Sequence, residues 1–199
     1  MLKDYISCLL MRKDLSEEDS RQAMSLIMSG KATDAQIAGF LVALRMKGET
    51  VPEITGCARA MRSAATGVKV DDPDAIDTCG TGGDTKGTFN VSTAAAIVTA
   101  AAGVTVAKHG NRSVSSSSGS ADVLQELGVN IEAPLPVVEN CVRETGIGFL
   151  FAPLLHKAMK YAIGPRKEIA LRTIFNILGP LTNPAMASAQ LLGVYAPEL

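Results

Sequence analysis

Short apolar runs alternate with helical segments from Asp71 onward, and this alternation is the feature that most constrains the fold. Strands are expected at 75–79, 104–107 and 147–152, with a possible short strand at 129–132 and helices at 92–102, 120–127 and 136–145. Such alternation predicts an α/β fold with a mostly parallel sheet and helices on its faces. Ligands of these sheets bind at the carboxyl ends of the strands. The polar segments that follow residues 79 and 107 are therefore the first places to look for chemistry.

Residues before Gly67 carry the punctuation of helices. Three helices are expected, bounded by Ser16 and Gly30, by Thr33 and Gly48, and by Pro52 and Gly67. The buried face of the second helix is expected to be the apolar stripe Ile37, Phe40, Leu41 and Leu44.

Residues after Gly164 are expected to return to the helical part. A helix is expected from His156, interrupted at Gly164-Pro165 and resuming through Arg172. A turn-rich segment at 176–184 and the start of a strand at 190–195 follow. The prediction is a small helical domain of residues 1–70, joined by 165–189, and an α/β domain of residues 71–164 and 190–199. Because the chain ends as a strand begins, this α/β domain is expected to be incomplete at its C-terminal end.

Composition excludes several classes of protein. A hydrophobic content of 47% with 20% charged residues is typical of a globular chain, and a net charge of −1 argues against a broad nucleic-acid-binding face. The four cysteines are far apart and only two histidines are present, which argues against zinc and indicates a cytoplasmic protein with free thiols. The first apolar run is too short for a signal peptide, and the most apolar stretch, 91–107, fits a buried helix and strand, so no membrane association is expected.

The first segment that suggests chemistry is Asp-Thr-Cys-Gly-Thr-Gly-Gly-Asp at 77–84. It is neither a Walker loop, because Lys86 precedes a glycine, nor a dinucleotide fingerprint, because Thr85 stands where the third glycine is needed. The glycines nevertheless allow backbone N–H groups to converge on an anion. Asn90, Ser92 and Thr93 then open a helix, whose N-terminus also favours negative charge. An ordinary strand-to-helix turn with an N-cap remains an open alternative.

Two further segments carry cations. Lys-His-Gly-Asn-Arg at 108–112 follows a predicted strand and precedes a hydroxyl-rich run to Ser120, which suits a ligand with several phosphates better than a plain basic surface loop. Gly-Pro-Arg at 164–166 places a guanidinium that can hold a carboxylate bidentately, with His156 and Lys160 one helical turn apart upstream. Taken alone, this third segment fits a helix break with a surface arginine better than a carboxylate site. Serine hydrolase elbows and His-Glu-x-x-His pairs are absent from the sequence.

Together these motifs resemble the anthranilate phosphoribosyltransferases, and the resemblance runs over nearly the whole chain. Its ordered elements are Thr-Asp-Ala-Gln-Ile-Ala-Gly-Phe-Leu from Thr33, Cys-Gly-Thr-Gly-Gly-Asp, Asn-Val-Ser-Thr, Lys-His-Gly-Asn-Arg, Ser-Gly-Ser-Ala-Asp-Val-Leu, Gly-Pro-Arg and Asn-Ile-Leu-Gly-Pro-Leu-Thr-Asn-Pro. Each motif alone is weak, and the ordered set is specific. The resemblance implies transfer of the phosphoribosyl group of phosphoribosyl diphosphate (PRPP) to the amine of anthranilate in tryptophan biosynthesis, with release of diphosphate and with Mg2+.

The resemblance also implies site residues. PRPP would be held by Gly80, Gly83, Asp84, Thr88, Asn90, Val91, Ser92, Thr93, Lys108, His109, Gly110, Asn111, Arg112, Ser113, Val114, Ser115, Ser116 and Ser120. Anthranilate would be contacted by Gly80, Asn111 and Arg166, with His109, His156 and Gly179 along its path. Ser92 would also bind Mg2+.

Mechanism follows from the chemistry that the resemblance implies. Diphosphate leaves the ribose with oxocarbenium character, so Mg2+, Lys108 and the loop amides are expected to neutralise its charge. The amine is a neutral nucleophile, so positioning matters and no general base is assigned. The family's adjacent Asp-Glu pair, which binds Mg2+, is expected beyond Leu199, so this polypeptide alone is expected to be inactive. A homodimer formed through the N-terminal helices is implied by the resemblance only.

Two alternatives remain open. Pyrimidine nucleoside phosphorylases share the architecture, although Asn-Val-Ser-Thr and Lys-His-Gly-Asn-Arg resemble the anthranilate enzymes more. A non-catalytic, nucleic-acid-binding relative of the fold would need a basic groove, which the net charge of −1 disfavours.

Overall fold

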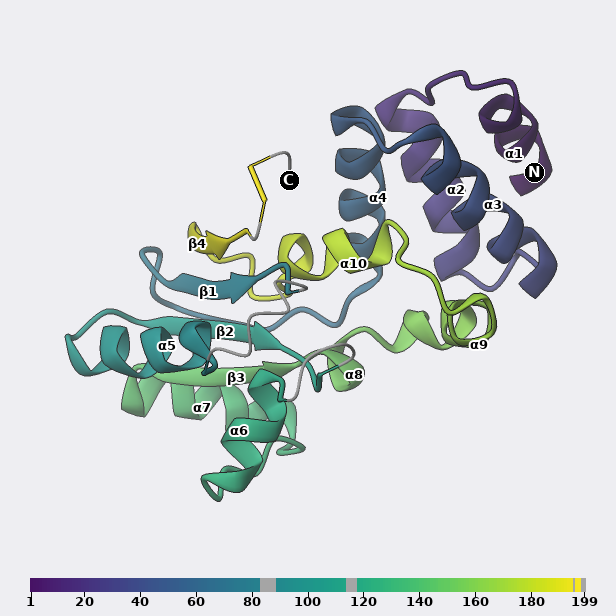
Figure 1. Ribbon diagram of the computed structural model, residues 1–199. Coiled ribbons are helices and arrows are strands. Elements are labelled where there is room, and N and C mark those ends of the chain that lie inside the picture. The colour runs from purple at the N-terminus through teal and green to yellow at the C-terminus, as the bar shows by residue number, and fades with distance from the viewer. Residues whose placement is uncertain (83–88, 114–117, 195, 198–199) are drawn as a thin grey trace. The chain divides into compact units, whose positions relative to one another are not determined.

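The computed structural model (Figure 1) describes residues 1–82, 89–113, 118–194 and 196–197, and it separates into two compact units. The helical unit comprises Met1–Ala65 and His156–Thr182, and the α/β unit comprises Thr66–Leu155 and Asn183–Leu199. The chain thus crosses between the units three times. The return to helices begins at His156, ahead of the expected boundary at 165, and it ends at Thr182, before the expected 189.

The helical unit is built from helices of both its chain segments. They are α1 Leu2–Leu10, α2 Glu17–Met28, α3 Asp34–Lys47, α4 Val51–Ala64, α9 Lys160–Ile169, α10 Phe175–Leu178 and the 3-10 helix η2 Gly179–Thr182, with the short connector η1 at Lys157–Met159. The predicted caps form as local hydrogen bonds: Ser16 accepts from the backbone N–H of Asp19 at 3.0 Å, and Thr33 forms a capping box with Gln36.

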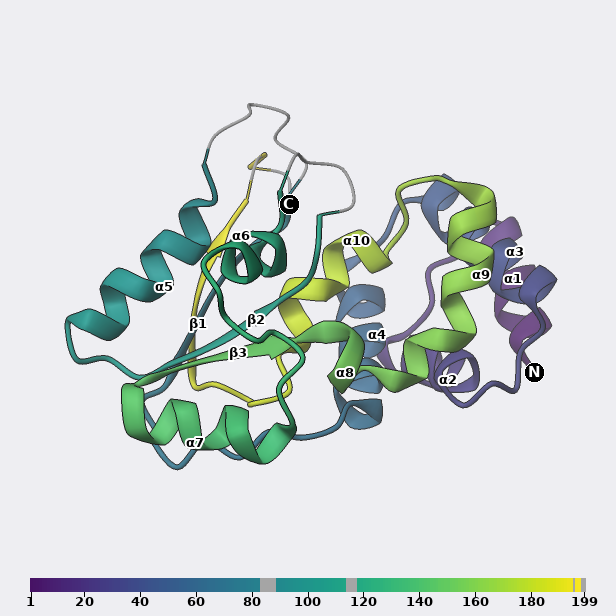
Figure 2. The same ribbon diagram turned by 90° about the horizontal axis from the view of Figure 1, so that it is seen from below.

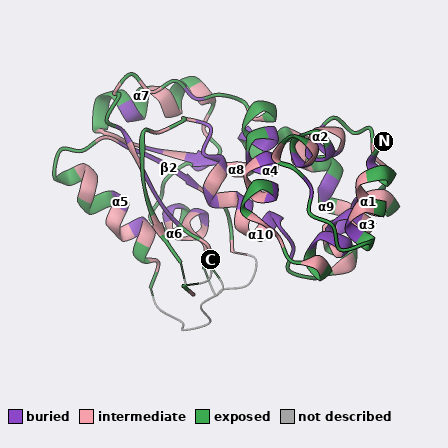
Figure 3. Cartoon of the chain, turned by 90° about the horizontal axis from the view of Figure 1, so that it is seen from above, coloured by how far each residue is buried: buried purple, intermediate pink, exposed green. Residues whose placement is uncertain are grey.

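One apolar core holds this unit together (Figure 3). The predicted stripe on α3 is confirmed, because Ile37, Phe40, Leu41 and Leu44 are all at most 1% exposed. Ala162 of α9 and Leu178 of α10 belong to the same core, so the residues after 155 complete the bundle that the first 65 begin.

A buried ion pair ties the helix ends together. Glu53, which is fully buried near the start of α4, accepts from Lys47 at the end of α3 at 2.9 Å, from the backbone N–H of Leu15 at 2.9 Å and from Thr50. Lys47 also bonds Asp14 at 2.7 Å. These bonds fix the loops between α1 and α2 and between α3 and α4.

The α/β unit contains a four-stranded sheet of order β3-β2-β1-β4, with all three neighbouring pairs parallel. Its strands are β1 Ile76–Gly80, β2 Val106–Gly110, β3 Ile147–Phe151 and β4 Ala189–Gly193, and its helices are α5 Val91–Ala101, α6 Ser120–Glu126, α7 Leu135–Thr145 and α8 Ala152–Leu155. The predicted parallel sheet is confirmed. The connections β1-α5-β2 and β2-α6-α7-β3 run in the same direction across the sheet, so the right-handed crossover rule places α5 and α7 on one face.

Three local predictions were wrong. Residues 129–132 form a turn, because the side chain of Asn130 accepts from the backbone N–H of Glu132 at 3.1 Å and bends the chain. Helix α9 continues through Gly164-Pro165 and ends at Ile169, followed by the C-cap residue Ala170 with φ 48°. Proline removes a single N–H donor, and burial of Ala162 and Pro165 against the bundle holds the helix together. The segment 176–184, expected to be turns, contains most of α10 and all of η2.

Candidate functional site

The carboxyl ends of β1 and β2 lie side by side in the sheet and lead into the two predicted ligand segments. β1 ends at Gly80, and the following Gly82 has φ +66°, a conformation that favours glycine. The predicted PRPP residues Gly83, Asp84, Thr88, Val114, Ser115 and Ser116 lie outside the described residues. The other predicted residues of these segments are described, and they form the site that follows.

The N-terminus of α5 is organised by Asn90. Its Oδ1 accepts from the backbone N–H of Thr93 at 3.1 Å, from the Thr93 hydroxyl at 2.8 Å and from the Ser92 hydroxyl at 3.3 Å. This N-cap fixes the hydroxyl of Ser92 at the first turn of a helix of eleven residues. The first turn of a helix carries partial positive charge, so the Ser92 hydroxyl lies where an anion is favoured.

Lys108 of β2 contacts the N-terminus of α5 through its side chain. Its side chain is 2% exposed, and its Nζ donates to the carbonyl oxygen of Thr78 at 2.5 Å and to the Ser92 hydroxyl at 3.3 Å. The Thr78 hydroxyl donates in turn to the carbonyl of Ser92 at 2.9 Å. Burial lowers the pKa of Lys108, while the nearby Asp77 opposes that shift. The structure therefore brings Ser92 and Lys108 together, as the sequence motifs suggested.

Asp77 is a site residue whose role the sequence did not reveal. It is 1% exposed in β1 and accepts from the backbone N–H of His109 at 3.1 Å and from the amide of Gln190 at 3.1 Å. Its carboxylate thus joins β1, β2 and β4 and places a negative charge near Lys108. The signal in the sequence that could have indicated this role is a carboxylate in the middle of a predicted buried strand. Cys79 is buried, and burial raises the pKa of its thiol to about 12, which disfavours the reactive thiolate.

Asp122 organises the second segment, and sequence reasoning also missed it. Its carboxylate accepts from the backbone N–H of Ser113 at 3.0 Å, from that of Gly119 at 2.8 Å and from Arg112 at 3.1 Å. These bonds, led by the one from Ser113, lower the pKa of Asp122. A Cβ atom on Gly119 would lie 2.4 Å from the Ser113 nitrogen, so only glycine fits this closure. The ends of the hydroxyl-rich segment are therefore held together by one side chain.

Arg112 lies at the exposed edge of this closure. Its guanidinium is 5.9 Å from the centre of the Phe151 ring, and its backbone N–H donates to Asn111 at 2.7 Å. Gly110, at the end of β2, is packed so closely that a Cβ would lie 2.8 Å from the Phe149 ring. Ser120 begins α6 directly after the closure.

Three of the predicted anthranilate residues belong to the helical unit. Arg166 of α9 is half-buried, its guanidinium lies 4.8 Å from the centre of the Phe175 ring, and burial lowers its pKa. Among the described residues, no carboxylate forms an ion pair with it. His156 is buried, and burial lowers its pKa more than a bond to the Thr182 backbone raises it, which favours the neutral imidazole. Gly179 begins η2.

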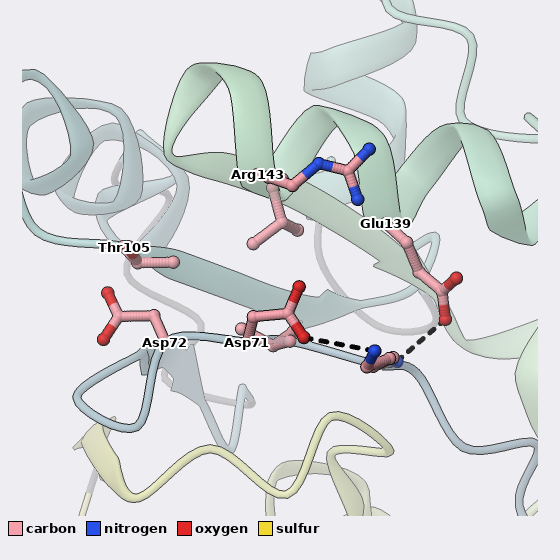
Figure 4. A pocket seen from close by; sticks show the side chains of 8 residues that line it. Asp71, Asp72, Thr105, Glu139 and Arg143 are labelled. Atoms are coloured by element: carbon pink, nitrogen blue, oxygen red, sulfur yellow. Dashed lines mark hydrogen bonds and ion pairs between the residues drawn. The ribbon is translucent and has the colours of Figure 1, made fainter.

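A separate pocket of about 350 Å³ lies at the opposite, amino-terminal side of the sheet (Figure 4). Figure 4 shows Asp71 and Asp72 ahead of β1 and Thr105 ahead of β2, facing Glu139 and Arg143 of α7. Within the pocket, Lys69 pairs with Asp71 at 3.4 Å, and the backbone N–H of Lys69 donates to Glu139 at 2.8 Å. Parallel sheets place their ligands at the other end of the strands, so this pocket is not the candidate site.

The described residues supply only part of the ligand set that a divalent metal ion needs. The Ser92 hydroxyl supplies one hard oxygen of the kind that Mg2+ prefers, but the described residues contain no cluster of three or more His, Cys, Asp or Glu side chains that could hold a metal ion. The same part of the chain contains no helix long and apolar enough to cross a bilayer.

Comparison with known proteins identifies the architecture. Residues 3–65 match the model of a "Glycosyl transferase family, helical bundle domain", and residues 72–199 match that of a "Glycosyl transferase family, a/b domain". The anthranilate phosphoribosyltransferases of Clostridium kluyveri and Syntrophobacter fumaroxidans are 60% and 59% identical over 199 residues. The chain covers 59% of each of these relatives, so it spans about three fifths of their length.

Solved structures of anthranilate phosphoribosyltransferases are also similar to this chain. Anthranilate phosphoribosyltransferase (TrpD) from Thermus thermophilus superposes with a TM-score of 0.92 at 49% identity, covering 98% of this chain and 59% of that one. The Saccharomyces cerevisiae enzyme in complex with PRPP and Mg gives 0.89 at 32% identity, covering 99% of this chain and 59% of that one. The chain therefore belongs to the glycosyl transferase family that the two domain models describe, and it is similar over its whole length to the anthranilate phosphoribosyltransferases.

Proposed function

We propose that this chain supplies the PRPP-binding segments, and part of the anthranilate-binding segments, of an anthranilate phosphoribosyltransferase. The observation that carries the proposal is the junction at the N-terminus of α5, where Ser92, Lys108 and Thr78 are joined by hydrogen bonds at the carboxyl end of β1. The relatives reported above favour this activity over that of a pyrimidine nucleoside phosphorylase, because they carry the name of the anthranilate enzyme.

Recognition of PRPP follows from the electrostatics of this junction. The α5 N-terminus and the buried ammonium of Lys108 both favour an anion at the carboxyl ends of β1 and β2. The closure made by Asp122 holds Ser113 and Gly119 together shortly after the carboxyl end of β2. These features suit a diphosphate, which carries several negative charges in a small volume.

Chemistry at this site requires the charge of the departing diphosphate to be neutralised. Lys108 holds the Ser92 hydroxyl in place, and Ser92 is the described residue that would bind Mg2+. When bound, Mg2+ would supply additional positive charge at the diphosphate oxygens. The chain's own contribution is to bind and orient PRPP so that the ribose carbon faces the incoming amine.

Recognition of anthranilate is assigned to Arg166. A planar guanidinium can hold a carboxylate through two hydrogen bonds, and the Phe175 ring keeps this guanidinium in a fixed orientation. Gly80, Asn111, His109, His156 and Gly179 remain the further predicted contacts along the path of anthranilate.

We also infer a homodimer and a cytoplasmic location. Leu10, Met11 and Met46 are each at least 62% exposed on the helical unit, which suits burial against a second copy. The four cysteines are free, which suits a reducing compartment. Light scattering of a chain extended to the length of its relatives tests the dimer, and a monomer mass would contradict it.

Binding and turnover test the proposed function separately. Titration calorimetry of residues 1–199 with PRPP and Mg2+ is expected to show weak binding that salt weakens further and that Ser92→Ala reduces. An anthranilate fluorescence assay is expected to show no turnover by this chain and turnover by the extended chain. Failure of the extended chain to consume anthranilate would exclude the proposed activity, and normal turnover by residues 1–199 would contradict the proposed need for further Mg2+ ligands.

A further inference from the structure

A second cavity, of about 260 Å³, lies inside the helical layer of the α/β unit. Its walls come from α5, from α6 and the loop after it, and from α7, and its floor is formed by β2 and β3. These elements can be followed around β3 in Figure 2. The cavity lies on the part of the sheet farthest from β4 in strand order, and it contains none of the helical unit's residues.

The cavity marks a gap in the packing of the unit. The buried apolar residues form two separate clusters, one around Ala107 and Leu150 and the other around Leu124 and Phe151. Val138 packs against the first cluster, Phe149 packs against the second, and both line the cavity. The gap is open to solvent, because Ile97, Leu127 and Val129 of its lining are 45%, 65% and 43% exposed, so a ligand that covered them would remove apolar surface from water.

The polar groups in the wall are already engaged. The Thr93 hydroxyl donates to Asn90 at 2.8 Å, the Thr145 hydroxyl donates to the carbonyl of Cys141 at 2.8 Å, and the Lys108 ammonium donates to Thr78. No Asp or Glu lies among the described residues of the lining, and Lys108 is its one charged side chain. A ligand in the cavity would therefore contact mainly apolar side chains and few polar groups that are free to bond it.

We propose that this cavity is a binding site for a small, uncharged aromatic molecule of one or two fused rings. Apolar cavities of roughly 150 Å³ are known to hold benzene, so about 260 Å³ leaves room for a second ring. A cation is disfavoured, because the described lining holds no carboxylate, and an anion is disfavoured, because the Lys108 ammonium is already bonded to Thr78 and Ser92. The exposed Asn130 at the rim can bond one polar atom of the ligand. The site is distinct from the proposed contact between Arg166 and anthranilate, a carboxylate.

Cys141 gives a direct readout of occupancy. Its thiol lines the cavity and is exposed, whereas Cys57 and Cys79 are buried and Cys8 belongs to the helical unit. With indole as the probe, alkylation of Cys141 by N-ethylmaleimide, followed by mass spectrometry, is expected to slow about tenfold at ten times the dissociation constant. The alkylation rate of Cys8 in the same sample is expected to stay constant.

Paired variants locate the effect. Ala133→Leu fills part of the cavity and is expected to abolish the protection of Cys141 by indole, measured against the variant's own rate without indole. Ala101→Leu, at the exposed end of α5 and outside the lining, is expected to retain it. If Ala133→Leu fails to fold by circular dichroism, the wild-type labelling decides the matter. A Cys141 rate unaffected by millimolar indole, or equal slowing of Cys141 and Cys8, would overturn the proposal.

Discussion

Replacing Lys108 by methionine tests the organisation of the candidate phosphate site. Methionine nearly conserves the volume of the lysine stem but removes the ammonium that bonds Thr78 at 2.5 Å and Ser92 at 3.3 Å. A hydrogen bond from a charged donor contributes about 1.5–3 kcal/mol. Because each 1.4 kcal/mol corresponds to about a factor of ten, the affinity for PRPP is expected to fall about ten- to a hundredfold.

Stability is expected to respond differently from affinity. Lys108 is 2% exposed, so the folded chain already sustains the cost of burying its charge, and methionine removes that cost together with the hydrogen bonds. The two effects offset each other, and the free energy of unfolding is expected to change by less than about 2 kcal/mol. Calorimetry with PRPP and Mg2+, beside urea unfolding of both proteins, measures the two quantities. An affinity within twofold of wild type would refute the reasoning that Lys108 organises the site.

Three further perturbations have defined outcomes. Glu53→Ala leaves the buried Lys47 with Asp14 as its one remaining carboxylate partner and is expected to destabilise the chain by about 3–5 kcal/mol in urea unfolding, whereas Glu17→Ala, at a partly exposed ion pair, is expected to change the free energy of unfolding by less than about 1 kcal/mol. Arg166→Ala in the extended chain is expected to raise the KM for anthranilate about ten- to a hundredfold and that for PRPP far less; equal effects would move Arg166 out of the carboxylate site. The pKa of Asp122 is lowered from its ordinary value of 3.8, so its stabilisation is full above that value and is lost as the pH falls through the folded-state pKa. Asp122→Asn is therefore expected to weaken the dependence of the free energy of unfolding on pH below about pH 4. An unchanged pH dependence would show that the hydrogen bonds of the Asp122 carboxylate do not contribute to stability.

Features set by near neighbours were predictable from the sequence. The caps at Ser16 and Asn90 depend on a hydrogen bond to a residue three positions away, so the spacing of residue types is sufficient to predict them. The parallel sheet was predictable for a similar reason, because each strand and each crossover helix has its own local pattern. The resemblance of the ordered motifs then indicated the family.

Features set by distant residues could not be predicted in this way. Gln190 bonds Asp77 across 113 positions, and the amide of Asn183 donates to the carbonyl of Ala107 across 76 positions at 2.8 Å. Neither pair has a signature in local composition. The error at Pro165 has the same origin, because tertiary burial overrode the rule that proline breaks helices. The error at 129–132 is local instead, because Asn130 accepts a hydrogen bond from the backbone N–H of Glu132, two positions on, and this bond overrode the propensity for a strand.

The three crossings between the units have a practical consequence for dissecting this protein. The Thr66 N–H donates to the carbonyl of Leu155 at 2.8 Å, and the Val68 N–H donates to that of Pro184 at 3.2 Å. The places where the α/β unit is left and re-entered therefore flank the same short stretch of chain. Removing His156–Thr182 and joining Leu155 to Asn183 through a few glycines would give an uninterrupted α/β module beginning at Thr66. The helical unit could be divided in the same way, because its second segment, His156–Thr182, could be added to residues 1–65 as a synthetic peptide.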